Sequence, residues 1–196
     1  MDLDYDFFGI DKHLMYPKKG SLLISEPFLQ DTYFKRSIVL ITEHNKEGSV
    51  GFVLNKPTKL TINEVLDDFP SFDADISIGG PVATNTIHFC HTLGEAIPNT
   101  VKVVHGIYWG GDFNVLKDLI KNDVVEKDQV RFFIGYSGWG VDQLEREITE
   151  NSWIVTDVKS KNILDYSSKD SWKIILSRLG KKYKMWANYP ENPVMN

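Results

Sequence analysis

The stretch RSIVLITEHNKEGSVGFVLNKP, residues 36–57, contains two runs that are rich in β-branched residues. These runs, Ser37–Thr42 and Ser49–Leu54, flank the polar sequence EHNKEG. Two such runs around a short polar connection predict a β-hairpin. Gly48 is the residue that supplies the unusual backbone dihedral of the turn.

A helix signal follows the hairpin directly, in TINEVLDDFP, residues 61–70. Thr61 and Glu64 have the spacing of a capping box, and the apolar residues behind them recur at helical intervals. Because proline cannot continue a helix, we expect this one to end at Pro70.

The remaining segments alternate between strand and helix patterns. Further strands are predicted in Ser21–Ser25, DISIGGPV (75–82), TIHFCHTL (86–93), VKVVHGIYW (101–109), QVRFFIGY (129–136) and SWIVTDV (152–158). Further helices are predicted from Asp112 to Ile120, from Val141 to Thr149 with Asp142 and Glu145 as a variant capping box, and around Trp172 with Gly180 just past the end. A hairpin combined with strand–helix–strand units predicts an α+β fold with a mixed sheet partly covered by helices.

The composition describes a chain with an ordinary hydrophobic core. The 196 residues fit one domain, 1–196, with an N-terminal arm (1–20) and a C-terminal extension (181–196). The net charge of −5 disfavours capture of nucleic acid or of an anionic membrane. A single cysteine excludes an internal disulfide, and the acidic start MDLDYDFFGI lacks the positive charge of a signal peptide. With no apolar run long enough to span a membrane, these features predict a cytoplasmic protein.

Ser137 lies in FFIGYSGWGVDQLEREI, residues 132–148, where glycines surround a serine between strand and helix patterns. A nucleophile elbow requires G-x-S-x-G, but Trp139 occupies the position of the second glycine. All five histidines precede Ser137, which is also the wrong order for that fold. The alternative is that the glycines form a tight turn at which Trp139 packs.

The same glycines do not form a phosphate-binding loop, because no P-loop lysine follows and carboxylates begin the next helix. HFCH, residues 88–91, is the one cluster of soft metal ligands, but it places only His88 and Cys90 on one face of a strand. No metal site and no cofactor is therefore predicted. The basic and aromatic run GKKYKMW, residues 180–186, is the most favourable segment for a nucleic acid. We interpret it as a solvated helix end, so direct nucleic-acid binding is not expected.

Three blocks together resemble the AlgH/YqgE family of bacterial proteins. They are YFKRSIVLITEHNKEGSVGFVLNKP, GGPV with the later HFCHTL, and YSGWGVDQLEREITENSWIV. The resemblance implies a mixed, largely antiparallel sheet bent into a pseudo-barrel and flanked by helices. It implies no established activity; the family's name derives from a proposed role in transcriptional control of alginate production. This chain departs from the family pattern at Asp142, where glycine is common, and at Cys90, where leucine is common.

Carried over position by position, the resemblance covers Arg36, His44, Gly51, Asn55, Pro57, Gly79, Gly80, Pro81, His91, Gly138, Trp139, Gln143, Leu144, Glu147 and Trp153. Turns explain some of these residues structurally, and the predicted turn positions are Gly79, Gly80, Pro81, Gly138 and Gly140. Polar and aromatic groups near turns are instead candidates for a ligand pocket, and these are His44, Asn55, His91, Trp139, Gln143 and Glu147. The competing interpretation is that such side chains only tie loops to the backbone.

Three functional hypotheses remain open at this point. A non-enzymatic binding or regulatory module, with a small molecule or a protein as partner, fits the absence of a complete catalytic constellation. A hydrolase-like enzyme would use His91 with Ser137 or Glu147, and requires these side chains to lie within hydrogen-bond reach. A structural partner in an assembly would show an exposed apolar patch instead of a cleft.

Overall fold

The structure is a computed structural model and describes residues 16–158 and 164–190. Most of the predicted N-terminal arm and the end of the C-terminal extension therefore lie outside the described residues. The strands are β1 (Ser21–Ser25), β2 (Ile38–Asn45), β3 (Gly48–Val53), β4 (Pro57–Thr61), β5 (Asp75–Ile78), β6 (Val82–His91), β7 (Val101–Val104), β8 (Ile107–Trp109), β9 (Val130–Trp139) and β10 (Trp153–Asp157). The helices are α1 (Ile62–Val65), α2 (Phe113–Lys121), α3 (Gln143–Thr149), α4 (Ser171–Arg178) and α5 (Lys181–Ala187), with short 3₁₀ turns η1 (Gly94–Ala96) and η2 (Lys127–Gln129).

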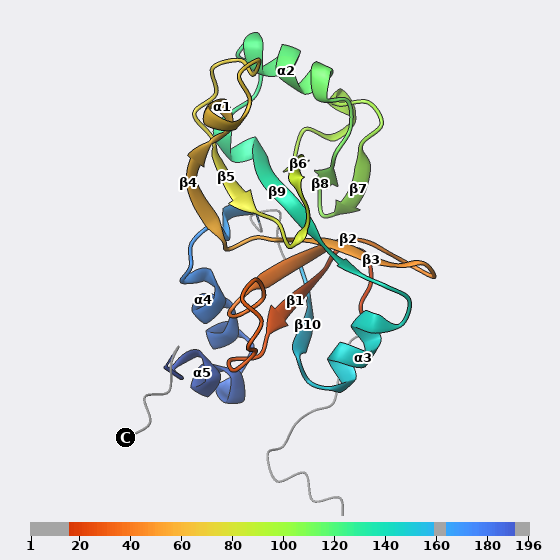
Figure 1. Cartoon of the computed structure of the whole chain (residues 1–196), viewed down its shortest axis with the longest axis vertical. Helices are drawn as coiled ribbons and strands as arrows, with labels where there is room; N and C mark the ends of the chain where they lie inside the picture. Colours follow the sequence, from red (N-terminus) through yellow and green to blue (C-terminus); the bar gives the residue numbers. More distant parts are fainter. Residues whose placement is uncertain (1–15, 159–163, 191–196) are drawn as a thin grey trace, which may run out of the picture.

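The strands form one mixed sheet. Eight of them follow the order β10-β1-β2-β3-β9-β6-β8-β7, and β4 and β5 join the sheet beside this path. The pairings are antiparallel apart from β5 with β9. The sheet is curled, and helices lie around it (Figure 1). The structure confirms the predicted α+β fold with a mixed, largely antiparallel sheet.

In Figure 1, strand β9 begins among the upper strands, between β5 and β6, and continues to β3 in the lower group, so that it connects the two groups. Its first half pairs with β5 and β6, and its last three residues pair with β3. Between these halves Gly135 has φ +64, and a Cβ atom there would lie 2.7 Å from the carbonyl oxygen of Val82. Because only glycine tolerates both conditions, Gly135 allows one strand to pass from one group to the other.

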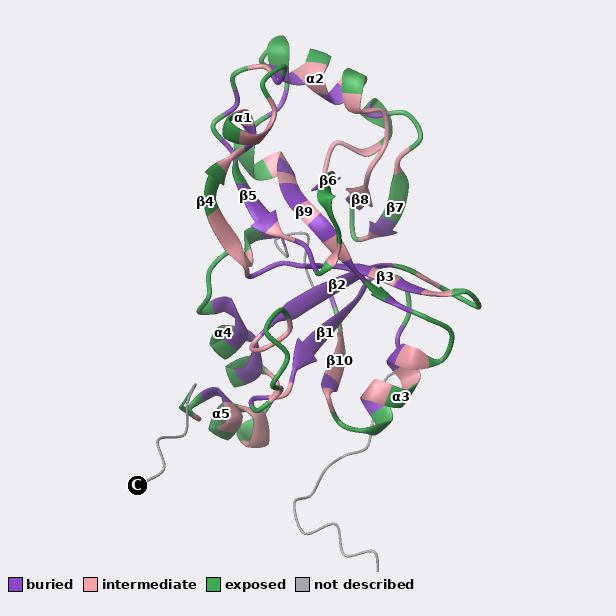
Figure 2. Cartoon of the chain, viewed as in Figure 1, coloured by how far each residue is buried: buried purple, intermediate pink, exposed green. Residues whose placement is uncertain are grey.

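Strand β1 and the first five residues of β2 are buried on both faces, and Figure 2 shows both strands largely in the colour of buried residues. Alternate residues of a strand point to opposite faces, so one face of β2 carries Ile38 and Leu40 and the other carries Val39 and Ile41. The first pair belongs to the core cluster that includes Trp172 of α4, and the second pair to the cluster that includes Leu144 of α3. Helices α4 and α3 thus cover opposite faces of the same strands.

The predicted hairpin is confirmed, with a shorter connection than expected. Strand β2 continues to Asn45 and β3 begins at Gly48, so only Lys46 and Glu47 lie between them. Gly48 has φ +132, as predicted for the turn. A Cβ atom at this position would lie 2.1 Å from the carbonyl oxygen of Trp139, so the hairpin also requires glycine where β9 ends beside it.

Helix α1 is much shorter than the sequence pattern predicts. The backbone N–H of Thr61 donates to the Glu64 carboxylate over 2.7 Å, so this part of the capping box is present, but the helix ends after Val65. The side chain of Asn63 bonds to the backbone of residues 69–72 instead: its amide donates to Phe69 O and Pro70 O, and its oxygen accepts from Phe72 N. These bonds satisfy backbone groups of residues 69–72 in an irregular loop. The loop takes the place of the further helical turns that the sequence pattern predicts.

The structure differs from the sequence predictions at two further places, residues 101–109 and Gly138. The segment 101–109 is a hairpin rather than one strand, because His105 (φ 47) and Gly106 (φ 79) form a turn between β7 and β8. The predicted turn at Gly138 is wrong, because Gly138 lies within β9 and pairs with Val50 of β3.

The predicted capping box at Asp142 is also wrong. The Asp142 side chain makes no cap bond, and the Gln143 side chain accepts from Gly140 N over 3.0 Å. Gly140 therefore does lie at the turn into α3.

Candidate functional site

Glu147 of α3 binds two indoles at once. Its Oε2 atom accepts hydrogen bonds from Trp139 Nε1 (2.9 Å) and Trp153 Nε1 (2.8 Å), and its Oε1 atom accepts from Gln143 Nε2 (2.9 Å). Both tryptophans are buried. Three of the predicted pocket residues, Trp139, Gln143 and Glu147, are thus brought together, in a network whose hydrogen-bonding groups are engaged with one another.

The aromatic rings of this network are packed closely. Phe34 lies against both indoles, with ring centroids 5.8 Å from Trp139 and 5.4 Å from Trp153, and the two indoles meet edge to face at 5.9 Å. We call Phe34, Trp139, Gln143, Glu147 and Trp153 the tryptophan–glutamate cluster. Its contacts fasten α3 and β10 to the end of β9, which is a structural role.

His44 lies near this cluster, on β2 beside the β2–β3 turn. Its Nδ1 atom bonds to Ser49 Oγ over 2.8 Å, and its Nε2 atom is 3.6 Å from the Glu145 carboxylate. The register pairs Ser49 with Trp139, so His44 is next to the tryptophan–glutamate cluster along the sheet.

His91 is fully buried at the other end of β9. Its Nε2 atom bonds to Thr100 Oγ1 (2.8 Å) and lies 3.1 Å from Gly110 O, while its Nδ1 atom accepts from Leu93 N over 3.3 Å. Burial lowers the pKa of His91, an effect only partly opposed by the bond to the Gly110 carbonyl. A neutral ring with its proton on Nε2 satisfies all of these partners, so His91 ties β6 to the segments around Thr100 and Gly110.

The residues of the hydrolase hypothesis do not meet. His91 pairs with Val130, whereas Ser137 lies seven residues further along β9, about 20 Å away at strand spacing. Ser137 is fully buried, and its hydroxyl donates to Gly79 O over 2.9 Å. Glu147 is engaged by the two indoles. This geometry does not support acid–base or nucleophilic chemistry by His91 with either residue.

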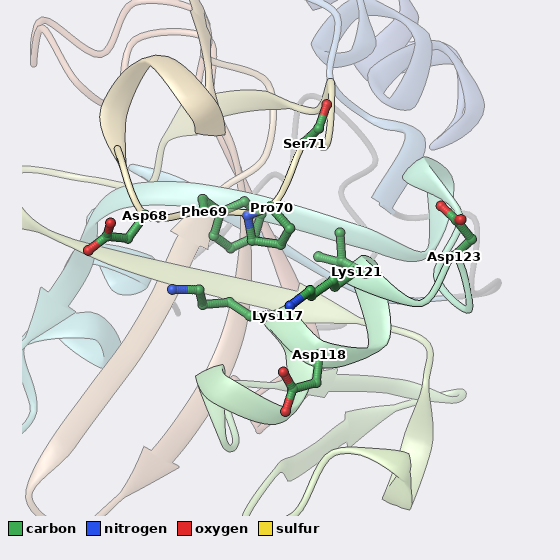
Figure 3. A pocket seen from close by; sticks show the side chains of 9 residues that line it. Asp68, Phe69, Pro70, Ser71, Lys117, Asp118, Lys121 and Asp123 are labelled. Atoms are coloured by element: carbon green, nitrogen blue, oxygen red, sulfur yellow. The ribbon is translucent and has the colours of Figure 1, made fainter.

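A shallow pocket of about 570 Å³ lies between α2 and the loop after α1. Figure 3 shows Asp68 and Lys117 on one side of it and Asp123 at the opposite end. Its lining also includes Lys121 and Asp118. Three carboxylates and two ammonium groups nearly balance, so this pocket does not select a ligand by the sign of its charge.

A second pocket, of about 240 Å³, is strongly basic, and we call it the cationic pocket. It lies between the entry to β2 and the start of α4, and is lined by Arg36, Asn55, Lys56, Lys169, Asp170, Trp172 and Lys173. Four cations against one carboxylate leave a formal excess of three positive charges here, in a chain whose net charge is −5. An excess of one sign in a concave site favours an anionic ligand.

Arg36 is one of the four cations that line the cationic pocket. Its guanidinium lies 4.9 Å from the ring centroid of Trp172, and one terminal nitrogen donates to Tyr189 O over 2.6 Å. Its Nε atom is buried and has no hydrogen-bond partner within the described part of the chain. A buried donor without a partner is costly, so a ligand oxygen that accepts from Nε would recover that free energy.

Asn55 holds the backbone of Arg36 in place. Its side-chain amide donates to Arg36 O (2.8 Å), and its oxygen accepts from Ile38 N (2.9 Å). Arg36 has φ 51, a conformation that non-glycine residues rarely adopt, and the bonds of Asn55 stabilise it. Of the six predicted pocket residues, Asn55 is thus the one that lines the cationic pocket, while His44 and His91 lie elsewhere.

Sequence reasoning missed the lysines of the cationic pocket. Lys169 and Lys173 are exposed and form no ion pair with any residue that the structure describes. They lie more than a hundred residues from Arg36 in the sequence, so no local motif joins them to it. Arg36 itself was identified through the resemblance, but not as a pocket residue.

The structure also describes potential metal ligands, the single thiol and the helices. Among residues 16–158 and 164–190, no three His, Cys, Asp or Glu side chains are arranged to hold a metal ion. Cys90 is fully buried, and burial raises the pKa of its thiol to about 12. None of the helices that the structure describes has the length and apolar character of a membrane span.

Comparisons with known proteins agree with this fold. A UPF0301 protein of Parabacteroides distasonis is 45% identical over 193 residues, covering 97% of this chain and 98% of the relative. A UPF0301 protein of Cytophaga hutchinsonii is 45% identical over 179 residues, covering 91% and 98%.

Two solved structures share the architecture. A protein from Corynebacterium diphtheriae matches with a TM-score of 0.72 at 19% identity, covering 89% of this chain and 93% of that chain. The AlgH protein from Pseudomonas aeruginosa matches with a TM-score of 0.69 at 26% identity, covering 88% and 94%. A family model described as AlgH-like matches residues 22–184. The chain therefore belongs to the AlgH-like family.

Proposed function

We propose that this protein is a non-enzymatic binding module that takes a small anion, of the phosphate or carboxylate type, in the cationic pocket. The observation that carries the proposal is the buried, unpartnered Nε of Arg36 beside an excess of positive charge. Arginine presents a fixed fork of donors that matches the oxygens of both anions. A volume of about 240 Å³ accommodates one such group, so the pocket would bind the anionic part of a ligand.

The arrangement of the pocket favours binding over catalysis. The lining side chains are cations, an amide, a carboxylate and an indole, with no serine, threonine, cysteine or histidine among them. Asp170 is at the N-cap position of α4, where a carboxylate interacts favourably with the helix dipole. The lysines supply attraction and Arg36 supplies directed hydrogen bonds, which together bind an anion.

A regulatory role would act through this ligand or through a protein partner. The chain is acidic overall, with a pI of about 5.5, and direct contact with DNA would require an extended basic surface. The cationic pocket is instead a small concave site at one place in the fold. In a role in transcriptional control, this chain would then recognise the anion as a signal and would not contact the nucleic acid itself.

The test is titration of the protein with inorganic phosphate at low ionic strength, followed by calorimetry and by NMR of the arginine side chains. We expect saturable binding that weakens with added salt, together with a shift of the Arg36 Nε–H resonance. Lys169→Gln combined with Lys173→Gln removes two charges and is expected to weaken binding about tenfold.

The matched control is Lys117→Gln combined with Lys121→Gln, which removes two lysines from the charge-balanced pocket. Its affinity for phosphate is expected to equal that of the unmodified protein. Absence of saturable binding, or an equal loss in both double variants, would show that net charge and not the cationic pocket attracts the anion.

A further inference from the structure

A third pocket, of about 430 Å³, lies at an unpaired edge of the sheet, and we call it the edge cleft. It is lined by Leu66, Asn85, Ile87, His88, Phe89, Trp109, Gly110, Gly111 and Phe113. One side of β6 pairs with β9 along much of its length, but the other side pairs with β8 only at Cys90 and His91. Among the residues that the structure describes, no strand therefore lies on the outer side of the part of β6 that borders the edge cleft.

The backbone of Ile87 points toward this open edge. Ile134, its partner on β9, directs its carbonyl away from β6, because Ile134 O accepts from Gly79 N over 2.8 Å. The pair Ile87–Ile134 is thus a non-hydrogen-bonded pair of the antiparallel ladder. Two residues on, Phe89 O accepts from Gly110 N over 2.9 Å, again on the side away from β9. Since residues two apart in a strand direct their backbone groups the same way, the N–H and C=O of Ile87 face outward where β8 has ended.

The walls of the edge cleft are apolar and partly aromatic. Phe89 and Phe113 pack with their ring centroids 5.8 Å apart, and Leu66 adds an aliphatic side chain. Gly110 has φ +65, and a Cβ atom there would meet no atom within 4 Å, so the wall at this point is bare backbone beside open space. Aromatic and aliphatic side chains beside exposed backbone favour a planar ring over a bulky or strongly charged ligand.

We propose that the edge cleft binds a planar heteroaromatic molecule that carries an N–H donor next to an oxygen or nitrogen acceptor, as a lactam or a nucleobase does. The N–H and C=O of one extended residue lie side by side and point the same way, so a ligand with an adjacent acceptor and donor bonds to both of them. The ring then lies against the aromatic wall. This site is separate from the cationic pocket and does not depend on the proposed anion function.

The probe is 2-quinolone, a bicyclic lactam, and its matched control is N-methyl-2-quinolone, which has the same ring without the donor. Titrations followed by amide NMR are expected to shift the Ile87 N–H resonance, with a dissociation constant in the millimolar range. The N-methyl compound is expected to bind about fivefold or more weakly, because it leaves the Ile87 carbonyl without a partner.

Two glycine substitutions locate the site on the protein. Gly110→Ala adds a methyl group beside the edge cleft and is expected to weaken 2-quinolone binding. Gly106→Ala is the control: Gly106 also has a positive φ and open space around an added Cβ atom, but it lies in the β7–β8 turn. Binding to Gly106→Ala is expected to equal that of the unmodified protein.

Three outcomes would overturn the proposal: no binding of 2-quinolone at millimolar concentration, equal affinity for the two quinolones, or binding that leaves the Ile87 resonance in place. If Gly110→Ala fails to fold, the comparison of the two quinolones on the unmodified protein still decides the question.

Discussion

Glu147→Ala is expected to lower the free energy of unfolding by about 3 kcal/mol, measured by urea denaturation. The substitution removes the acceptor of two buried indole N–H groups and of the Gln143 amide. Hydrogen bonds to a charged group contribute about 1.5–3 kcal/mol each, and a buried donor that loses its partner cannot regain water without opening the core. Because Glu147 is itself partly exposed, we expect the lower part of the range that two such bonds would give.

Glu150→Ala is the matched control, since it removes an exposed glutamate just past the end of the same helix. It is expected to change stability by less than about 0.5 kcal/mol. A double-mutant cycle between Glu147→Ala and Trp153→Phe is expected to give a coupling energy of about 1 kcal/mol or more. If Glu147→Ala instead left stability unchanged, the carboxylate would be dispensable for the fold, and a ligand-binding role for it would regain support.

The success of the sequence predictions depended on how local their physical cause is. The β2–β3 hairpin and the Asp112 cap of α2 depend on residues within a few positions of each other, and both are present: the Asp112 side chain accepts from Asn114 N and Val115 N. The predicted length of helix α1 was wrong because Asn63 bonds to residues six or more positions away. The apolar spacing of that segment was real, but the tertiary bonds of Asn63 were stronger than the helical preference.

The interpretation of Ser137–Trp139 failed for the same physical reason. Glycines around a serine are typical of a turn when only the chain itself is considered. Here β3 lies beside them, and the pairing of Ser49 with Trp139 and of Gly51 with Ser137 continues the strand. Trp139 was correctly identified as a packing residue, but it packs from the end of a strand and not from a bend.

The candidate sites also differ in how close their residues lie in the sequence. The resemblance gave six pocket candidates; three of them, Trp139, Gln143 and Glu147, lie within nine residues of each other, and the structure joins these three through hydrogen bonds. The cationic pocket and the edge cleft depend on segments far apart in the chain. Gly110 and Gly111 mark the end of β8 in the sequence, but neither the position of that end beside Ile87 nor the approach of α4 to Arg36 has a signal there.

Cys90 is expected to be almost inert toward thiol reagents in the folded protein and to react fully after denaturation. Burial raises the pKa of its thiol from 9.0 to about 12, against a smaller opposing effect of the nearby Arg131 charge. Three pH units correspond to about a thousandfold less thiolate near pH 8, and full burial also blocks access of the reagent. The measurement is the rate of modification by a chromogenic disulfide, with and without denaturant. Rapid modification of the folded protein would contradict the burial of Cys90.

The same shift predicts a loss of stability in alkaline solution. Above pH 9 the unfolded thiol loses its proton while the folded thiol keeps it up to about pH 12, so rising pH favours the unfolded state in this window. The loss is about 1.4 kcal/mol per pH unit in excess of that from other groups. Cys90→Ala removes this contribution, so the difference in unfolding free energy between the unmodified protein and the variant should shrink steadily from pH 9 upward. A difference that stays constant with pH would mean that the thiol ionises equally in both states, which a fully buried side chain cannot do without opening of the core around Phe133 and Trp172.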